Sequence, residues 1–348
     1  MILITGGAGY IGSHAAVELL ENGYDIVILD SLVNGSLEAI LRIKELTGKE
    51  FEFYHADLMD IEQLENIFRR HDIKAVMHFA GLKSVNESVS TPLHYYEKNI
   101  SGTLNLCKIM SQFNVRELVF SSSATVYQPS DNRPVDEDSP LGATNPYGRT
   151  KLMIEEILHD LYKSDPFWKI AILRYFNPIG AHISGRIGED PTGSPNNLMP
   201  YITQVAIGRR PLLQVFGEDY DTPDGTGIRD YIHVTDLVKG HLKALEYLAG
   251  HSGIETFNLG TGKGYSVLEL IKAFTLASAV NIPYQVVDRR DGDIAVCYAS
   301  PEKAKKRLLW KAEKNLLEMC EDAWRWQSMN PHGYSGNEAE IEIIAEVN

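Results

Sequence analysis

Two residue types that can move a proton, a tyrosine and a lysine, stand four residues apart at Tyr147 and Lys151. Apolar residues repeat with helical spacing over residues 152–161, and positions i and i+4 lie on one face of a helix. A free phenol has a pKa of about 10 and is a weak base at neutral pH, but a nearby ammonium lowers this pKa. The pair could therefore act as a general base. The same spacing more often reflects a solvated lysine beside a partly buried tyrosine, so the surrounding motifs decide between the two interpretations.

The first residues of the chain predict a nucleotide-binding turn. Residues 1–5 form a continuous apolar run that is typical of a buried parallel strand, and glycines follow at positions 6, 9 and 12. Helical apolar spacing then begins at Ile11, and Gly23 stands where that helix would end. In this context of strand, glycine turn and helix, backbone N–H groups can approach a pyrophosphate at the helix N-terminus. The spacing Gly-x-x-Gly-x-x-Gly differs from the commoner Gly-x-Gly-x-x-Gly.

An acidic residue, Asp30, ends the second predicted strand, which covers residues 26–29. It falls near the distance at which dinucleotide-binding proteins carry an acid that accepts hydrogen bonds from ribose hydroxyls. A carboxylate at this place also repels a 2′-phosphate, so we predict NAD rather than NADP. The alternative is an ordinary aspartate that caps a turn at the end of a strand.

Strand and helix patterns alternate further along the chain, which predicts an α/β fold with a doubly wound parallel sheet of the Rossmann type. The further strands are expected at residues 51–55, 75–79, 118–120 and 170–173, and a long helical pattern spans residues 93–113. Ligands of such sheets bind at the carboxyl ends of the strands. Polar and aromatic residues lie at or just past these ends, namely Asp30, Asp57, Lys83, Ser121 to Ser123, and Tyr175 to Asn177. A serine hydroxyl there could bind a substrate hydroxyl beside Tyr147, although serine-rich loops more often make local turn bonds.

The second half of the chain is less regular. Turns rich in glycine and proline over residues 180–195 suggest loops that close over a ligand. Helices are expected at 198–207, 237–248, 267–274 and 316–326, and a strand at 213–216. We therefore predict a Rossmann NAD-binding domain over residues 1–177 and a smaller mixed α/β substrate-binding lobe over residues 178–348. The acidic tail after Tyr334, with Glu338, Glu340 and Glu342, is expected to be mobile.

Composition excludes several classes of partner. The net charge of −14 argues against nucleic acid and against an anionic membrane surface. The three cysteines, Cys107, Cys297 and Cys320, are odd in number and far apart, so they predict neither a disulfide framework nor a zinc site, and no metal is expected. No signal peptide or membrane-spanning stretch is evident in the sequence. These features favour a protein of the reducing cytoplasm.

The glycine turn, Asp30, the serines at 121–123, and the pair of Tyr147 and Lys151 follow one another along the chain in this order. In this arrangement the chain resembles the extended short-chain dehydrogenase/reductase family. Five further stretches, at residues 78–83, 121–127, 173–178, 196–200 and 224–233, resemble the UDP-hexose 4-epimerases within that family. The similarity runs from residue 1 to about residue 334. It implies an isomerase of galactose metabolism that interconverts UDP-glucose and UDP-galactose through a 4-keto sugar with bound NAD. It also implies a homodimer that pairs the helices carrying Asn99 and Tyr147.

The resemblance further implies a role for individual residues. Tyr147 would be the acid/base on the sugar 4-hydroxyl, Ser123 would align that hydroxyl, and Lys151 would hold the nicotinamide ribose and tune Tyr147. The NAD site would consist of Gly6, Gly9, Tyr10, Ile11, Gly12, Asp30, Asn34, Asp57, Leu58, Phe79, Ala80, Gly81, Lys83, Asn99, Ser121, Tyr147, Lys151 and Phe176. The UDP-sugar would be held by Lys83, Ser123, Tyr147, Asn177, Asn197, Leu198, Phe216, Arg229, Tyr231, Arg290, Asp293 and Cys297.

Cys297 also bears on which sugars are accepted. Bacterial members of the family that are restricted to plain hexoses often carry tyrosine at this position. The smaller cysteine leaves space for a 2-acetamido group, so we predict that UDP-N-acetylglucosamine and UDP-N-acetylgalactosamine are also substrates. A buried cysteine acting only as a small hydrophobic residue is compatible with the same sequence.

Two alternative functions remain open from the sequence. The first is a sugar-nucleotide dehydratase or decarboxylase on the same scaffold. Related dehydratases carry an Asp-Glu pair where this chain has Ala124 and Thr125, and neither of these side chains can transfer the protons that elimination requires. The second is a non-catalytic, NAD-sensing binding protein, against which the intact Ser123, Tyr147 and Lys151 argue.

Overall fold

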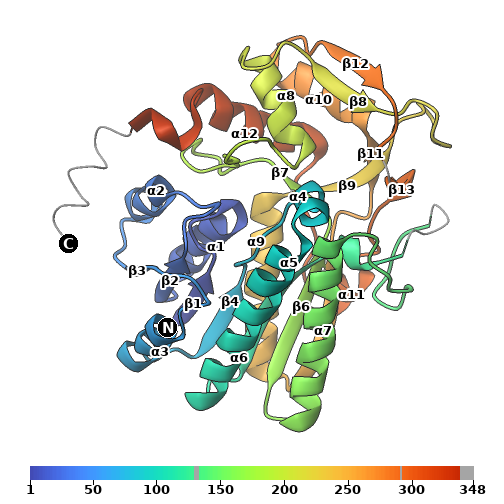
Figure 1. The fold of residues 1–348 in the computed structure, drawn as a ribbon. Helices are drawn as coiled ribbons and strands as arrows, with labels where there is room; N and C mark the ends of the chain where they lie inside the picture. Colours follow the sequence, from blue (N-terminus) through green and yellow to red (C-terminus); the bar gives the residue numbers. More distant parts are fainter. Residues whose placement is uncertain (129–132, 291, 338–348) are drawn as a thin grey trace.

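The structure is a computed structural model that describes residues 1–128, 133–290 and 292–337 (Figure 1). Helices flank a central sheet, and a smaller lobe lies over one end of that sheet (Figure 1). The mobile tail predicted at Glu338, Glu340 and Glu342 lies outside the described residues.

The central sheet has seven strands in the order β10-β6-β5-β4-β1-β2-β3, and every neighbouring pair is parallel. The prediction of a doubly wound parallel sheet is therefore confirmed. The strands are β1 (Ile2–Thr5), β2 (Ile26–Asp30), β3 (Glu52–His55), β4 (Ala75–His78), β5 (Glu117–Ser123), β6 (Lys169–Tyr175) and β10 (Gly253–Leu259). The strand order reverses between β1 and β4, and open α/β sheets bind ligands at the carboxyl ends of the strands at such a point.

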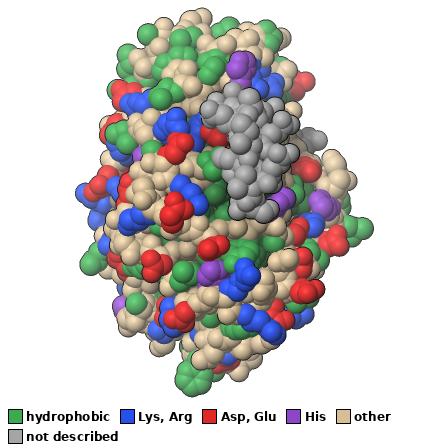
Figure 2. Space-filling view, turned by 90° about the vertical axis from the view of Figure 1, so that its left-hand side faces the viewer, with side chains coloured by type: hydrophobic (Ala, Val, Ile, Leu, Met, Phe, Trp, Pro, Cys, Tyr) green, Lys and Arg blue, Asp and Glu red, His purple; other side chains and the backbone are tan. Residues whose placement is uncertain are grey.

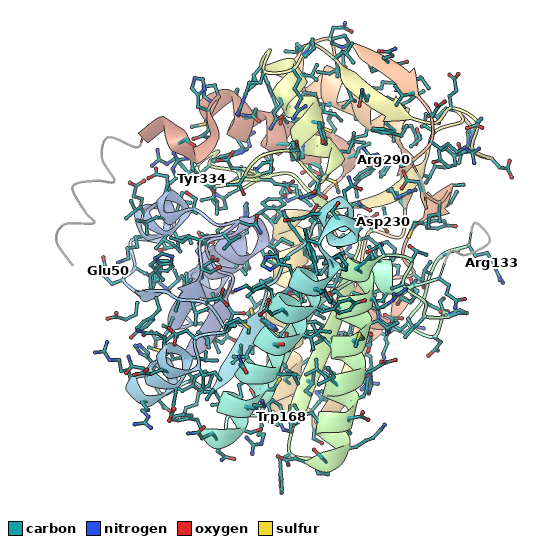
Figure 3. The ribbon with its side chains drawn as sticks, in the orientation of Figure 1. Glu50, Arg133, Trp168, Asp230, Arg290 and Tyr334 are labelled. Atoms are coloured by element: carbon teal, nitrogen blue, oxygen red, sulfur yellow. The ribbon has the colours of Figure 1, made fainter. Side chains whose placement is uncertain are left out.

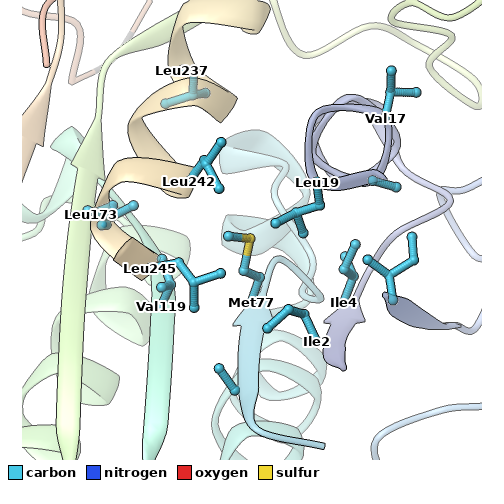
Figure 4. Close-up of a cluster of buried hydrophobic side chains, with 14 of the residues drawn as sticks. Ile2, Ile4, Val17, Leu19, Met77, Val119, Leu173, Leu237, Leu242 and Leu245 are labelled. Atoms are coloured by element: carbon cyan, nitrogen blue, oxygen red, sulfur yellow. The ribbon is translucent and has the colours of Figure 1, made fainter. Parts of the chain in front are cut away.

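Each face of the sheet is covered by helices because successive strand residues point to opposite sides. Ile2 and Ile4 pack in a cluster with α1 (Tyr10–Glu21), α2 (Leu37–Thr47) and α9 (Val234–Gly250) (Figure 4). Leu3 packs on the other face with α3 (Ile61–Arg70), α6 (Gly102–Gln112) and α7 (Pro146–Ser164). Full burial of one such side chain stabilises a fold by about 1.5–3 kcal/mol, so the two clusters fix the strand ends that carry the polar residues.

The main sheet is not confined to residues 1–177, where the sequence led us to place the first domain. β10 pairs with β6 along its whole length, from Gly253 opposite Lys169 to Leu259 opposite Tyr175. The helix before it, α9, packs on α1 and supplies Leu237, Leu242 and Leu245 to the same core (Figure 4). The chain thus leaves the sheet after β6, builds part of the lobe, and returns to add an edge strand.

The smaller lobe is mixed α/β, as predicted. Its four-stranded sheet contains β7 (Asn177–Ile179), β9 (Ile228–His233), β11 (Gly264–Ser266) and β13 (Val296–Cys297), while β8 (Leu213–Phe216) pairs with β12 (Tyr284–Val287). Its helices are α8 (Leu198–Ala206), α10 (Val267–Ser278) and α12 (Leu316–Met329), and α11 (Glu302–Arg307) packs near β10. A separate hydrophobic cluster, which includes Ile202, Phe274 and Met319, forms the core of this lobe.

Acidic and basic side chains lie close together over the face of the molecule shown in Figure 2. Among the described residues, no group of three or more His, Cys, Asp or Glu side chains could hold a metal ion. None of the helices in the described part of the chain is long and apolar enough to cross a bilayer.

Candidate active site

A cleft of about 220 Å³ opens at the carboxyl ends of the strands, where β1 and β4 meet. It brings together residues that lie up to 169 positions apart in the sequence, from Gly6 to Tyr175. Its walls contain most of the predicted cofactor residues, namely Gly6, Gly9, Tyr10, Ile11, Gly12, Asp30, Asn34, Asp57, Leu58, Phe79, Ala80, Gly81, Lys83, Tyr147 and Lys151.

The glycine turn lets two parts of the backbone come unusually close. Gly6 has a φ of +76°, and a Cβ atom at this residue would lie 2.6 Å from the backbone nitrogen of Ala80. A Cβ atom at Gly12 would lie 2.1 Å from the carbonyl oxygen of Gly6. Side chains at these positions would push the start of α1 away from β1 and β4. With glycine, the first turn of α1 faces the cleft directly, and its N–H groups and dipole suit a pyrophosphate.

Asp30 is fixed on the wall of the cleft by two backbone groups. Its Oδ2 accepts a hydrogen bond of 2.9 Å from Ala8 N, and its Oδ1 accepts one of 2.8 Å from Leu32 N. Burial raises the pKa of this carboxyl above its ordinary value, and the two backbone hydrogen bonds oppose that rise. A carboxylate oxygen can accept more than one hydrogen bond, so the group can also receive ribose hydroxyls. The backbone N–H groups of the glycine turn suit the pyrophosphate of NAD, and the Asp30 carboxylate suits the hydroxyls of its ribose.

Helix α7 places Tyr147 and Lys151 on one face, as their spacing predicts. The helix begins with Asn145 as N-cap, whose Oδ1 accepts a 2.8 Å hydrogen bond from Gly148 N, and Pro146 occupies the first helical position. Lys151 is buried, and its Nζ donates a 2.8 Å hydrogen bond to the carbonyl oxygen of Ser121 at the end of β5. The lysine therefore ties α7 to the rim of the sheet.

The pKa of Tyr147 is raised by burial, and a hydrogen bond with Ser123 only partly opposes this. The sequence led us to expect a lowered pKa from the neighbouring ammonium, and the structure gives the opposite direction. Burial also lowers the pKa of Lys151 to about 8, against the attraction of the Glu155 carboxylate. Because the ammonium is itself desolvated and points to the Ser121 carbonyl, the phenol needs additional positive charge nearby to ionise at neutral pH.

Three predicted cofactor residues, Asn99, Ser121 and Phe176, are not among those that line the cleft. Asn99 lies in the π-helical turn η1 (Tyr96–Ser101), where its Oδ1 accepts a 2.8 Å hydrogen bond from Leu82 N and its Nδ2 donates to Thr150 Oγ1 at 3.0 Å. Ser121 offers its carbonyl to Lys151, and Phe176 packs in a separate apolar cluster with Val126. Asn99 and Ser121 thus contact residues of the cleft wall from behind.

Five of the predicted substrate residues lie on or beside strand β9 in the smaller lobe. Tyr231 of this strand is paired with Asn177 of β7, and Arg229 is paired with Cys297 of β13. Arg229 also lies 3.5 Å from an Oδ1 atom of Asp293. Strand β7, strand β13 and the loop just before β13 therefore converge on β9.

Another pair of predicted residues forms a second contact in the same lobe. The guanidinium of Arg290 lies 3.8 Å from the centre of the Phe216 ring, at the end of β8. An arginine held flat on an aromatic ring keeps its N–H groups free at its edges for phosphate oxygens. Figure 3 shows Arg290 on the side of the lobe that faces the central sheet.

A carboxylate that the sequence did not single out, Glu189, connects the two predicted sites. Its Oε1 lies 3.3 Å from Lys83 Nζ in the cleft and accepts a 2.7 Å hydrogen bond from Asn197 Nδ2 at the start of α8. Other cleft residues were also missed, namely Leu29, Ser31, Val33, Gly35, Ala56, Leu82, His94, Lys98 and Tyr175. Of these, Tyr175 was noted only as a residue at a strand end. The place of Glu189 in the loop predicted to close over a ligand was the one sequence signal for its role.

Comparisons with known proteins agree with this site. The family described as the NAD dependent epimerase/dehydratase family matches residues 2–260. The UDP-glucose 4-epimerase of Bacillus subtilis (strain 168) is 59% identical over 337 residues, which cover 97% of this chain and 99% of that protein. The UDP-glucose 4-epimerase of Mus musculus is 55% identical over 340 residues, with 96% of this chain and 98% of that protein covered.

Solved structures give the same result. The UDP-glucose 4-epimerase from Stenotrophomonas maltophila, with bound NAD and formylated UDP-arabinopyranose, has a TM-score of 0.93 and 52% identity, covering 95% of this chain and 98% of that chain. The enzyme from Bifidobacterium longum, in complex with NAD⁺ and UDP, has a TM-score of 0.93 and 50% identity, covering 95% and 99%. By sequence and by fold, this chain therefore belongs to the NAD dependent epimerase/dehydratase family and, within it, to the group of the UDP-glucose 4-epimerases.

Proposed function

We propose that this protein interconverts UDP-glucose and UDP-galactose by inverting carbon 4 of the sugar, with NAD held in the cleft. The observation that carries the proposal is that a buried tyrosine and lysine share this cleft with a glycine turn and a strand-end carboxylate. NAD, when bound, would supply the acceptor for a hydride from carbon 4 of the sugar, and the hydride would return to the opposite face of the same carbon. It is regenerated in each cycle and need not leave.

Tyr147 is the group that takes the proton from the sugar 4-hydroxyl and gives it back. Its side chain is buried, and burial raises the pKa of its hydroxyl. The positive charge of Lys151, together with that of the oxidised nicotinamide, favours the phenolate. Ser123, at the end of β5, aligns the same sugar hydroxyl and makes a hydrogen bond that also favours the phenolate.

The smaller lobe would anchor the UDP part while the sugar turns over. Arg229 and Arg290 suit the diphosphate because a guanidinium can donate two parallel hydrogen bonds to phosphate oxygens. The remaining proposed contacts to the nucleotide and sugar come from Asn177, Asn197, Leu198, Phe216, Tyr231 and Asp293. In the cofactor site, Asn99 and Ser121 act by supporting the residues that line the cleft, whereas Phe176 lies in the separate apolar cluster with Val126.

A single assay tests the proposal. Purified protein is incubated with UDP-galactose without added NAD, and the products are separated by chromatography. UDP-glucose should form, and a mixture of both sugars should result from either starting compound. A 4-keto-6-deoxy product would instead show a dehydratase, although Ala124 and Thr125 provide no acid or base for elimination. Bound NAD with no conversion of either sugar would show a binding protein.

We further propose that Cys297 sets the room beside the sugar, so that N-acetylated UDP-hexoses are also accepted. This half-buried cysteine packs against the cluster of Val126 and Phe176 and is paired with Arg229. In Cys297→Tyr, the ratio of rates for UDP-N-acetylglucosamine to UDP-glucose should fall about tenfold or more, because overpacking of about 1–3 kcal/mol would act on the acetylated sugar alone. Cys297→Ser, which stays small, is the control and should keep the ratio. An unchanged ratio in the tyrosine variant would exclude the gate.

The chain is also proposed to form a homodimer through the helices around Asn99 and Tyr147. Exposed apolar side chains gather on α4 (Val85–Ser90), α5 (Pro92–Tyr95) and α7, where Val89 is 63% and Leu93 is 82% exposed. We expect light scattering to give twice the mass of one chain for the wild type and the mass of one chain for Leu93→Glu. Phe167→Glu is the matched control, because Phe167 is 83% exposed but lies beyond the end of α7. A dimer that survives in Leu93→Glu would place the interface elsewhere.

A cytoplasmic location is proposed on the state of the cysteines. Cys107, Cys297 and Cys320 are all unpaired in the structure, which suits a reducing compartment. Fractionation of cells followed by the epimerase assay would test the location, and activity confined to an extracytoplasmic fraction would overturn it.

A further inference from the structure

Two segments of the smaller lobe, residues 186–192 and 326–335, lie across the cofactor side of the molecule next to α1 and α2 (Figure 1). They form the outer wall of a second hollow of about 200 Å³, whose inner wall is the glycine turn and the loop after Asp30. The two hollows share Tyr10, Asn34, Gly35 and Lys83, so the second continues from the cofactor cleft. We refer to residues 186–192 and 326–335 as the latch.

One buried side chain, Arg42, joins both segments of the latch to α2, one of the helices that cover the central sheet. It is 4% exposed, and its Nε donates a 2.7 Å hydrogen bond to Oε1 of Glu38 one turn earlier. Its Nη1 donates to the carbonyl oxygen of Arg186 at 2.9 Å and to Oδ1 of Asn330 at 2.7 Å. A single guanidinium therefore bonds to Glu38 and to two segments that lie 144 and 288 positions from Arg42 in the sequence.

The same guanidinium is enclosed by two aromatic rings of the latch. Its carbon lies 5.7 Å from the centre of the Trp326 ring and 5.1 Å from that of Tyr334. Tyr334 in turn fixes the other segment, because its backbone nitrogen donates to Asp190 Oδ2 at 2.7 Å and its hydroxyl accepts from Gly188 N at 3.3 Å. Figure 3 shows Tyr334 between α12 and α2. Arg42 thus holds residues 186–190 directly and through Tyr334.

The other contacts between the latch and the cofactor side are more exposed, including the surface ion pair between Arg186 and Glu45 of α2. Thr192 Oγ1 donates to Asn34 Oδ1 at 3.3 Å, and Lys83 Nζ lies 3.3 Å from Glu189 Oε1. Exposed polar contacts of this kind contribute little, because water competes for both partners. The desolvated fork of Arg42 is therefore the contact with the greatest influence on whether the latch stays closed.

We propose that Arg42 is a positioning residue that keeps the latch closed over the cofactor cleft and thereby slows the release of NAD. This rests on the proposed function, since it assumes NAD in the cleft. Arg42 contacts neither the reacting atoms nor any residue assigned to the chemistry. Its role is to hold the latch, which is the outer wall of the hollow that continues from the cofactor cleft.

The test measures NAD release from protein purified with its cofactor. The holoprotein is diluted into an excess of an NAD-consuming trap enzyme, and the NAD that remains bound is determined over time. Arg42→Lys, which keeps the charge but loses the fork, should release NAD at least tenfold faster than the wild type. With NAD added in excess, its kcat should stay within about twofold of the wild type. The melting temperature is measured alongside.

Arg116→Lys is the matched control. Arg116 also pairs with a carboxylate, Asp165, at 2.9 Å, and its guanidinium lies 5.3 Å from the centre of the Trp168 ring. Trp168 lies at the opposite end of the sheet from Tyr334 (Figure 3). This control should lose stability to a similar degree but release NAD at the wild-type rate.

Two outcomes would overturn the proposal. One is a wild-type release rate in folded Arg42→Lys, and the other is equally fast release from Arg116→Lys, which would point to a loss of global stability. If Arg42→Lys fails to fold, the double variant Glu38→Gln/Arg42→Met removes both buried charges and is tested in the same way. Wild-type protein that carries no NAD would refute the proposed function itself, which separates the two failures.

Discussion

Tyr147→Phe should lose the epimerase activity by a factor of about 10²–10⁴ or more, while the protein keeps its fold and its bound NAD. The ring of Tyr147 is buried, so phenylalanine fills the same space and preserves the packing against Leu82 and Tyr95. What is lost is the phenolic oxygen that we propose takes the proton from the sugar 4-hydroxyl. The rate of UDP-glucose formation from UDP-galactose at saturating substrate measures the effect, and absorbance of the denatured protein measures bound NAD.

Tyr95→Phe provides the control for this experiment. Tyr95 is a buried neighbour of Tyr147, but its hydroxyl donates to Glu87 Oε2 at 2.8 Å and accepts from Ser84 N at 3.0 Å. Removing this oxygen should cost some stability and leave the rate within a few-fold of the wild type. If Tyr147→Phe keeps more than a tenth of the wild-type rate, Tyr147 is not the acid/base of the reaction.

The parts of the site that are local in sequence could be predicted. The glycine turn, Asp30, and the pair of Tyr147 and Lys151 each follow from a strand end or from spacing on one helix, and all of them line the cleft. The helical pattern of residues 93–113 was also predicted, although the structure divides it into α5, η1 and α6. Asn99 lies in the π-helical turn and bonds to Leu82 and Thr150, and a periodic pattern does not reveal such contacts.

The parts that depend on distant pairing could not be predicted. The return of β10 to β6 leaves no mark in the local sequence, because a parallel edge strand is specified by what it packs against. The same holds for Glu189, whose role follows from meeting Lys83 across more than a hundred residues. The direction of the pKa shift of Tyr147 was wrongly predicted because burial is its largest cause. Sequence spacing indicates that Lys151 is near, but it does not show how deeply the phenol is buried.

Three buried histidines are expected to make the protein sensitive to mild acid. Burial lowers the pKa of His14 and His78 to about 3 and that of His241 to about 4. His78 also lies near the Lys151 ammonium, and His14 has a buried Nε2 without a hydrogen-bond partner among the described residues. Both features oppose a second proton on the ring.

These three histidines lower the free energy of unfolding as the pH falls. Between the folded value and an unfolded value of about 6.5, the unfolded chain binds more protons, so stability falls as the pH is lowered from about 6.5. Each histidine contributes about 1.4 kcal/mol per pH unit in this window. Several buried carboxyls, such as Asp30 and Asp230, have raised pKa values and act in the opposite direction, so a comparison between variants is needed to isolate one histidine.

His78→Asn isolates such a contribution. The histidine ring bonds to Thr5 Oγ1 at 2.7 Å and to Thr103 Oγ1 at 2.9 Å, so the variant loses stability at neutral pH. The difference in the free energy of unfolding between the wild type and His78→Asn should shrink by about 3 kcal/mol between pH 6 and pH 4. The reason is that asparagine, unlike histidine, takes up no proton in the unfolded chain. Urea unfolding of the wild type and of His78→Asn at several pH values measures the difference. A difference that stays constant with pH would mean that His78 accepts its proton in the folded protein as readily as in the unfolded chain.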